Sequence, residues 1–410
     1  MKIWTRLLIG TAAGIIAGFL LPISGGDTEI LLSRIVLLMQ NIAVYALLPL
    51  VFFAVIIAAD ELRDDRKVVS VMGHGILWTL GLSLPAAIVG ALAVLGLEPQ
   101  RIPPILQESR ALEQPDLWRA LTNTFGRNFF EGFIGAPQAL VPIAVAGLVI
   151  GLTLRFDREI TEPFRMVADS ANRIFYRINS VLVDFLALPI LAATMLLVLQ
   201  TRTAVDVMLF GQLLLVVGVA TGFLGFVVLP LVLRLTGTVH RPLRWLYAMT
   251  GPVLAALTTG DGYIALATGT RNAKENLGIS RRSGGIVYPF ATAFLKPGTA
   301  LVAASGFLLV IRSYTALDIS IGSLMTLIGT AWLSSLLLAH VPSGGVLLLL
   351  SYLALRYGQG MEESYLILLP IVPILQRIAA VLDTLSVAFV ATVVAEKNGH
   401  RKSIEKRMMA

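Results

Sequence analysis

The chain has 410 residues, of which 56% are hydrophobic and only 14% are charged. Soluble domains carry about 25% charged residues, so this composition excludes an ordinary soluble protein, and apolar runs along the whole chain predict an all-α polytopic membrane protein. Cysteine is absent, which excludes disulfides, thiolate nucleophiles and cysteine metal sites. The four histidines have no metal-ligand spacing, so we expect no metal site and no cofactor.

The net charge of +7 could indicate nucleic-acid binding, but its distribution favours another explanation. Lysine and arginine concentrate in alternate segments between apolar runs, as the positive-inside rule requires of cytoplasmic loops. We therefore expect contact with anionic membrane lipids, no nucleic-acid partner, cytoplasmic N- and C-termini, and a place in the inner or plasma membrane. The basic segments are residues 63–67, 155–177, 234–244, 271–282 and 397–407.

The first half of the chain predicts simple crossings of the membrane. Within the first apolar run, Gly10, Gly14 and Gly18 are four residues apart and share one helix face, which permits close helix packing. Residues 97–130 carry several prolines and mixed charges and are interpreted as an external loop, and residues 155–177 as an internal basic segment. The spans are expected at residues 3–22, 30–59, 68–96, 131–154 and 178–200.

The second half contains two apolar segments that do not read as single crossings. Residues 246–270 have basic flanks at both ends, which predicts a re-entrant hairpin that enters and leaves on the cytoplasmic side. Residues 317–358 are too long for one span and are interrupted by a proline and two glycines, which predicts a second hairpin of opposite orientation. The remaining spans are expected at residues 205–233, 283–312 and 364–395.

Between the two hairpins, Lys296 stands in an apolar run and is followed by Pro297, which lacks the N–H that a helix needs. A lysine at membrane depth costs about 2.5–3.5 kcal/mol on insertion scales unless it lines a wet cavity or meets a partner. A charge at a helix break therefore predicts a binding site near the midplane, as in secondary transporters built from inverted repeats. The alternative is a structural lysine that pairs with a carboxylate to fix helix packing.

Five motifs, in this order and spacing, resemble the dicarboxylate/amino acid:cation symporter family, which has the glutamate-transporter-like fold. They are ALLPLVFFAVIIAA, TRNAKENLGIS, YPFATAFLKPGTAL, VPSGG and PILQRIAAVLDTLSVAFVATVVAEKNG. The resemblance covers nearly the whole chain. It implies eight transmembrane helices plus two opposed re-entrant hairpins, a homotrimer, and an elevator mechanism in which a transport domain slides past a fixed scaffold.

The resemblance also implies a division of the chain into scaffold and transport domain. Scaffold spans one and two fall in residues 1–67, and span three, which belongs to the transport domain, falls in 68–96. The external loop and scaffold spans four and five fall in 97–203. The rest of the transport domain falls in 204–397 and is followed by a cytoplasmic basic tail in 398–410. The transport domain then holds span six, hairpin 1 near 243–280, broken span seven near 283–313, hairpin 2 near 317–358, and span eight.

The chain departs from the family pattern in the broken span. The family motif Asn-Met-Asp-Gly-Thr falls on Leu295, Lys296, Pro297, Gly298 and Thr299. The resemblance implies that the asparagine and the aspartate help to hold sodium and that the threonine touches the substrate. The two sodium-binding side chains are therefore replaced here, and the substrate-contacting Thr299 is retained.

The last span departs in the same way. By resemblance, the aspartate that grips the substrate's amino group falls on Gln376, and the arginine that holds a side-chain carboxylate falls on Ala379. Two sodium-binding positions fall on Asp383 and Val387. These changes argue against aspartate or glutamate as the substrate and favour a small organic anion or a neutral amino acid.

Together, the substitutions suggest that a fixed cation replaces a bound one. Sodium needs several hard oxygen ligands, and here side-chain oxygens are lost while an ammonium appears opposite a new carboxylate. We hypothesise that Lys296 and Asp383 form a buried pair that replaces part of the sodium machinery. The pair then either carries a proton or is a permanent tethered cation without sodium coupling.

Both hairpin tips supply further candidates for substrate binding. Asp261 contacts substrate or a proton, or only caps a helix. His340 senses pH as a proton site, or only packs. Backbone N–H groups at the second tip suit an anion, unless they form a plain turn. The candidates are Asp261, Gly262 and Tyr263 at the first tip and His340, Ser343 and Gly344 at the second.

Four functions stay open from the sequence. The first is a carrier driven by protons or by its own substrate gradient, and the second is a sodium-coupled carrier that keeps a site of backbone carbonyls. The third is a channel or a non-transporting substrate sensor on the same fold. An intramembrane enzyme is least expected, because no nucleophile–base pair or set of metal ligands has usable spacing.

Overall fold

The computed structural model describes residues 2–20, 26–102, 140–203, 207–314, 320–337, 344–357, 363–402 and 404. Apart from one isolated β-bridge between Ile279 and Arg401, these residues form helices and connecting turns, which confirms the all-α prediction. Six described helices are long and apolar enough to cross a membrane, or seven if a bent pair counts as one span. The prediction of His340 and Ser343 as site residues lies outside the described residues.

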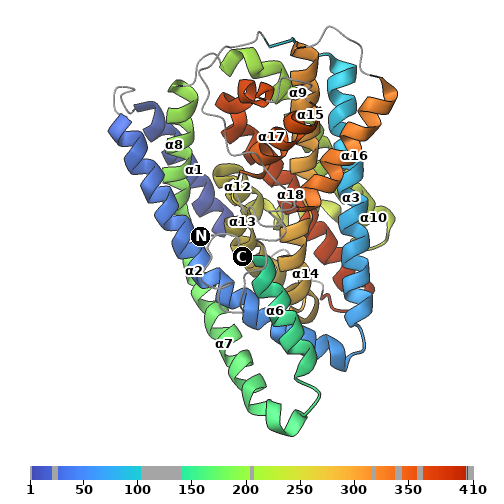
Figure 1. The fold of residues 1–410 in the computed structure, drawn as a ribbon. Helices are drawn as coiled ribbons and strands as arrows, with labels where there is room; N and C mark the ends of the chain where they lie inside the picture. Colours follow the sequence, from blue (N-terminus) through green and yellow to red (C-terminus); the bar gives the residue numbers. More distant parts are fainter. Residues whose placement is uncertain are drawn as a thin grey trace.

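The helices run in the order expected from the sequence (Figure 1). The first group comprises α1 (Ile3–Leu20), α2 (Gly26–Asp64), α3 (Val68–Leu97), α6 (Leu140–Thr153), α7 (Arg158–Phe185) and α8 (Ala187–Thr203). Next come η1 (Val207–Phe210), α9 (Gly211–Gly222), the π-helix η2 (Phe223–Val228) and α10 (Leu229–Leu235). The remainder comprises α11 (Pro242–Ala248), α12 (Thr250–Thr259), α13 (Gly262–Glu275), α14 (Arg281–Phe294), α15 (Pro297–Tyr314), α16 (Ile321–Leu337), α17 (Gly345–Tyr357), the 3₁₀ helix η4 (Ser364–Ile371) and α18 (Val372–Lys397).

Two packing groups can be distinguished among these helices. In the first group, α1 packs along α8, and α2 packs against α6, α7 and α8. In the second, α15 is surrounded by α3, α9, α16, α17 and α18, and almost every side chain from Pro297 to Val310 is buried. Figure 1 shows α1, α2, α7 and α8 on the left and lower side and α3, α15 and α16 on the right. The groups meet where α2 contacts α13 and α14.

The glycine face predicted in the first span packs against α8. A Cβ on Gly10 would lie 2.5 Å from the carbonyl oxygen of Ala187, and one on Gly14 would lie 2.5 Å from that of Leu191. Gly18 approaches Val198 in the same way. Glycine at these positions allows the two backbones to come close, which a larger residue would prevent.

The interpretation of residues 155–177 as a basic segment outside a span missed a helix. These residues form most of α7, which bends by 49° into α8 after Phe185. One face of α7 is buried through Ala168, Asn179 and Val183, while an apolar stripe that includes Ile160, Phe164, Ile174 and Ile178 is exposed. This strong amphipathicity predicts a helix whose apolar stripe faces lipid, and the charges alone concealed it.

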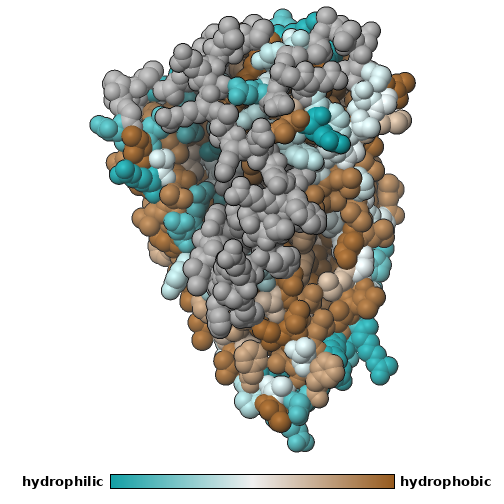
Figure 2. All heavy atoms as spheres, in the orientation of Figure 1, coloured by the Kyte–Doolittle hydropathy of each residue, from teal (hydrophilic) through white to brown (hydrophobic). Residues whose placement is uncertain are grey.

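The outer surface is apolar along the sides of the molecule. Figure 2 shows hydrophobic residues along its flanks and hydrophilic residues near both ends. Large apolar side chains that are exposed here include Leu20, Tyr45, Leu77, Leu92 and Val219. Exposed apolar surface on this scale is typical of a protein surrounded by lipid, in agreement with the predicted membrane location.

A network of ion pairs ties the two packing groups together at one end. The C-terminal turn of α2 supplies the carboxylates, and arginines of α14 and of the region around α7 supply the cations. The pairs are Asp60 with Arg165 (2.6 Å), Asp64 with Arg155 (3.1 Å), Asp65 with Arg282 (2.7 Å) and Glu61 with Arg281. Because Arg281 and Arg282 begin α14, these pairs fix its start against α2.

Candidate functional site

The break predicted at Lys296 lies between α14 and α15. Helix α14 ends at Phe294, and Leu295 takes an extended conformation with φ −88° and ψ 98°. Pro297 then begins α15, a position where a proline loses no helical hydrogen bond. The Lys296 side chain is only 8% exposed. The sequence therefore places an ammonium group inside the protein at the junction of two half-helices.

Asp383 of α18 caps the start of α15. One carboxylate oxygen accepts hydrogen bonds from the backbone N–H groups of Gly298 (2.6 Å) and Thr299 (3.4 Å), and the other accepts one from Thr299 Oγ1 (2.9 Å). These N–H groups have no partner within the helix, and a negative charge is favoured at this end of the helix dipole. The carboxylate thus compensates for the break in the span.

Gly298 allows this contact because it brings α15 close to α18. A Cβ on Gly298 would lie 2.1 Å from the carbonyl oxygen of Ala379, a distance that real Cβ atoms do not adopt. The retained glycine of the motif therefore has a packing reason.

The direct pair expected between Lys296 and Asp383 is not formed. Asp383 instead binds the start of α15, and neither it nor Asp261 makes an ion pair with Lys296 in the described part of the chain. Both carboxylates still lie close enough to act electrostatically on the ammonium. The reason for the difference is competition for the Asp383 carboxylate. The backbone N–H groups two and three residues after Lys296 have no partner within their helix, and the carboxylate accepts hydrogen bonds from them instead of pairing with the lysine.

The first predicted tip is the turn between α12 and α13. Gly260 has φ +66°, a left-handed conformation that favours glycine, and it ends α12. Asp261 then caps α13 by accepting hydrogen bonds from the N–H groups of Tyr263 (2.8 Å) and Ile264 (3.0 Å). Its second oxygen accepts one from Gln40 of α2 at 3.3 Å. The sequence left two roles open for Asp261, contact with substrate or a proton and capping of a helix. The structure shows the helix-capping hydrogen bonds.

Gln376 of α18 touches both tips. Its Oε1 accepts a hydrogen bond from the backbone N–H of Val346 (3.0 Å) in the first turn of α17, and its Nε2 donates one to the Gly260 carbonyl (3.4 Å). The neighbouring Arg377 donates to the carbonyl of Thr258 at 3.0 Å, near the C-terminal end of α12. A cation is favoured at that end of a helix, so Arg377 supports the first tip.

A small pocket lies between these elements. Its cavity volume is about 30 Å³, which is room for one or two water molecules. The predicted residues that line it are Gly262, Lys296, Gln376 and Asp383. An organic substrate does not fit this volume, so the elements around the pocket must separate before one can bind.

The chain matches the model of the sodium:dicarboxylate symporter family over residues 3–397. This protein belongs to the sodium:dicarboxylate symporter family. The match spans all the helices described above, and it confirms the family that the five motifs had indicated. None of the curated proteins compared with the chain matches it.

Membership of the sodium:dicarboxylate symporter family makes this chain a transporter-type membrane protein rather than an enzyme, with a small molecule as substrate. The described helices agree with a polytopic membrane protein. The family description names a class of transporter. The residues that line the pocket in this member of the family are the ones described above.

Four residues predicted for the site of this family member do not line its pocket. Asp261 and Thr299 are buried beside it as capping partners, and Gly344 precedes α17 with φ +85°. Tyr263 is only 3% exposed and accepts a hydrogen bond from the backbone of Leu140 in α6. The tyrosine therefore contacts the first packing group instead of lining the pocket.

Three polar residues that line the pocket were not predicted from the sequence. Tyr288 and Thr292 come from α14, and Thr384 comes from α18. Each lies near a predicted residue in the sequence: Thr292 is four before Lys296, and Thr384 follows Asp383. Tyr288 and Thr292 are four residues apart within α14 and share one face of that helix, but the helix break keeps Lys296 out of this spacing.

Proposed function

We propose that this protein is an elevator-type carrier of a small organic anion or a neutral amino acid that works without sodium coupling. In this proposal the Lys296 ammonium replaces a bound cation. The observation that supports it most is the buried ammonium at the helix break, which lines the same pocket as Gln376 and Asp383 and makes no ion pair in the described part of the chain.

Electrostatics favour an anionic group beside Lys296. Asp261 and Asp383 each bind the N-terminal end of a helix, and these ends carry a partial positive charge. The carboxylates are therefore already partly compensated, and the ammonium has three hydrogen-bond donors to offer. A substrate carboxylate is the partner that fits these donors, and Gln376 can bind a second polar group of the substrate.

The proposal assigns the two packing groups to the two parts of an elevator. The group around α2 and α8 would be the fixed scaffold, and the group around α15 the transport domain. The pairs α12–α13 and α16–α17 would be re-entrant hairpins whose tips close over the substrate. We further propose that the protein is a homotrimer and that each subunit has eight spans with both termini in the cytoplasm. The protein would lie in the inner or plasma membrane.

Transport into vesicles tests sodium independence. The purified protein is reconstituted and uptake of small dicarboxylates and neutral amino acids is measured with sodium or with choline as the only external cation. We expect equal, saturable uptake in both. Lys296→Met should abolish uptake with either cation. The control variant Gly329→Ala, a small change in α16 away from the pocket lining, should not. A strict need for sodium would overturn the proposal.

The coupling can then be resolved with proton gradients of opposite sign. If uptake follows the imposed pH gradient, the site carries a proton; if uptake follows only the substrate gradient, Lys296 acts as a tethered cation. Current that rises with substrate concentration without saturation would instead indicate a channel.

A second candidate is sodium-coupled symport through a site made of backbone carbonyls. It is favoured by the family description, which names sodium. A thermal-shift screen of the same substrates with and without sodium separates the two candidates. Stabilisation by a substrate only in sodium supports symport, and equal stabilisation without it supports the first proposal.

A further inference from the structure

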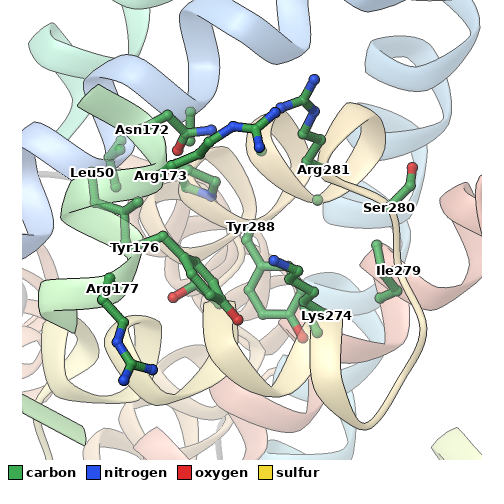
Figure 3. Close-up of a pocket in the computed structure, with 17 residues that line it drawn as sticks. Leu50, Asn172, Arg173, Tyr176, Arg177, Lys274, Ile279, Ser280, Arg281 and Tyr288 are labelled. Atoms are coloured by element: carbon green, nitrogen blue, oxygen red, sulfur yellow. The ribbon is translucent and has the colours of Figure 1, made fainter. Parts of the chain in front are cut away.

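A second, larger cavity lies between the two packing groups. Its volume is about 600 Å³, and its walls come from α2 and α7 on one side and from α13 and α14 on the other (Figure 3). Tyr288 lines both this cavity and the small pocket at Lys296. The two spaces are therefore neighbours, but the large cavity has its own set of charged residues.

Four cationic side chains line the large cavity. Arg173 and Arg281 lie together in Figure 3 and share the carboxylate of Asp169, at 3.0 Å for Arg173. The other two, Arg177 and Lys274, make no ion pair with any residue that the structure describes. Among the described residues, two cations of the cavity therefore have no carboxylate in an ion pair with them, and an anion would be attracted to it.

Aromatic groups add to this preference. The Lys274 ammonium lies 4.4 Å from the centre of the Tyr176 ring, which holds the lysine at the cavity wall. Tyr288 is only 2% exposed, and its buried hydroxyl has no hydrogen-bond partner in the described part of the chain. A buried hydroxyl without a partner costs free energy, and an oxygen-rich ligand would supply that partner.

Part of the wall is apolar. From α2 it includes Leu50, Val51 and Ala54, and from the other side Ile279 and Pro289. A ligand that matches this wall has an anionic end and a hydrocarbon body. Basic pockets between membrane-spanning helices bind the headgroups of anionic lipids in this way.

We propose that this cavity binds an anionic phospholipid, with the phosphate between Arg177 and Lys274 and an acyl chain along α2. Arginine binds phosphate through two parallel N–H groups, and lysine acts as a second point charge. All four cations are exposed, so the headgroup can enter from outside the protein. The bound lipid would lie between α2 and α14, the helices at which the two packing groups meet.

The test titrates the purified full-length protein in neutral detergent with phosphatidylglycerol or with phosphatidylcholine of the same chains. Bound lipid is counted by native mass spectrometry, and the melting temperature is recorded in parallel. We expect phosphatidylglycerol to bind at least about tenfold more tightly than phosphatidylcholine. The double variant Arg177→Gln with Lys274→Gln should weaken phosphatidylglycerol about 30-fold, or about fivefold for each cation.

Two control variants keep the test specific. Arg244→Gln removes an exposed cation of α11 that does not line the cavity and should change the affinity less than twofold. The double variant Arg177→Lys with Lys274→Arg keeps both charges and should keep the binding, which separates lost charge from lost folding. Equal losses in Arg244→Gln and in the cavity variant would overturn the proposal, since attraction would then be diffuse.

A soluble arm distinguishes the lipid from a free phosphate compound. Glycerol 3-phosphate, added at millimolar concentration, should displace phosphatidylglycerol only weakly, because it has no chain for the apolar wall. If it binds as tightly as the lipid, the ligand is a soluble phosphate and the lipid proposal is wrong. None of these outcomes depends on sodium or on the transported substrate, so the transport proposal stands or fails separately.

Discussion

Gln376 accepts a hydrogen bond of 3.0 Å from the backbone N–H of Val346, which lies 30 residues earlier in the chain. The same side chain reaches the carbonyl of Gly260 at the turn between α12 and α13. One amide on α18 therefore links the turn between α12 and α13 to the start of α17. The link closes a pocket of about 30 Å³ around Lys296, so opening the pocket must break it.

Removing the Gln376 amide should open the pocket more often. Gln376→Ala loses two hydrogen bonds, each worth about 1 kcal/mol, which corresponds to about 30-fold more frequent opening. The chain has no cysteine, so a thiol introduced at Ala380 in the pocket wall can report this opening. Its labelling by a small reagent should be about 30-fold faster in the Gln376→Ala background. Gln376→Glu keeps the acceptor for Val346 but loses the donor to the Gly260 carbonyl, so its rate should fall between those of the other two; equal rates in all three would contradict the link.

Gly298→Ala should destabilise the protein by about 1–3 kcal/mol, because the added methyl group meets the Ala379 carbonyl at 2.1 Å. The measurement is the melting temperature of the purified protein. Gly329→Ala is the matched control: it lies in α16, and apart from its chain neighbours and the backbone of its own helix no described atom lies within 4 Å of the new Cβ. The gain in helix propensity should leave stability equal or up to about 1 kcal/mol higher. A destabilised Gly329→Ala together with a tolerant Gly298→Ala would refute the packing argument.

Lys296 and Asp383 should be energetically coupled although they make no ion pair. Lys296→Met should remove the free-energy cost of burying a charge. Asp383→Asn should weaken the charge-assisted hydrogen bonds that the carboxylate accepts from Gly298 and Thr299, which are worth about 1.5–3 kcal/mol. In a double-mutant cycle, the unfolding free energies of the single variants should fail to add, with an interaction of about 0.5–3 kcal/mol. The melting transitions of the four proteins measure it. Strict additivity would show that the two groups do not sense each other.

His400 should make stability depend on pH. Burial and the nearby cations Lys67 and Arg282 lower the pKa of His400 below its ordinary value of 6.5, against the opposing effect of Asp65. Its Nδ1 lies 2.7 Å from the Ser283 hydroxyl. The unfolded chain therefore takes up the proton more readily than the folded protein, so this contribution to stability is present above pH 6.5 and is lost as pH falls through the folded pKa.

The measurement compares melting temperatures from about pH 8 to about pH 5. The original protein should lose stability below pH 6.5 more steeply than His400→Gln, which has no proton to take up. A His400→Gln protein with an unchanged pH profile would show that other groups determine the loss.

Much of the fold was predictable because membrane helices must satisfy their own backbone and follow apolar runs. The positions of α1, α2, α3 and α18, the break at Lys296 and the turn at Gly260 were all readable from the order of apolar, charged and breaking residues. The helix α7 was missed, since its charged face resembles a loop in a count of charges. The pocket was predictable in part: Lys296, Gln376 and Asp383 were identified from the sequence, and Tyr288 was not.

By itself, the sequence determined that an ammonium stands at a broken helix inside an apolar protein, because composition and proline chemistry act locally. Only the tertiary structure decided where the opposing carboxylates went. Asp383 and Asp261 could each have paired with Lys296. Instead, Asp383 accepts hydrogen bonds from backbone N–H groups at the start of α15, and Asp261 accepts them from N–H groups at the start of α13. Competition between partners depends on distances between distant segments of the chain, and only the packed helices fix those distances.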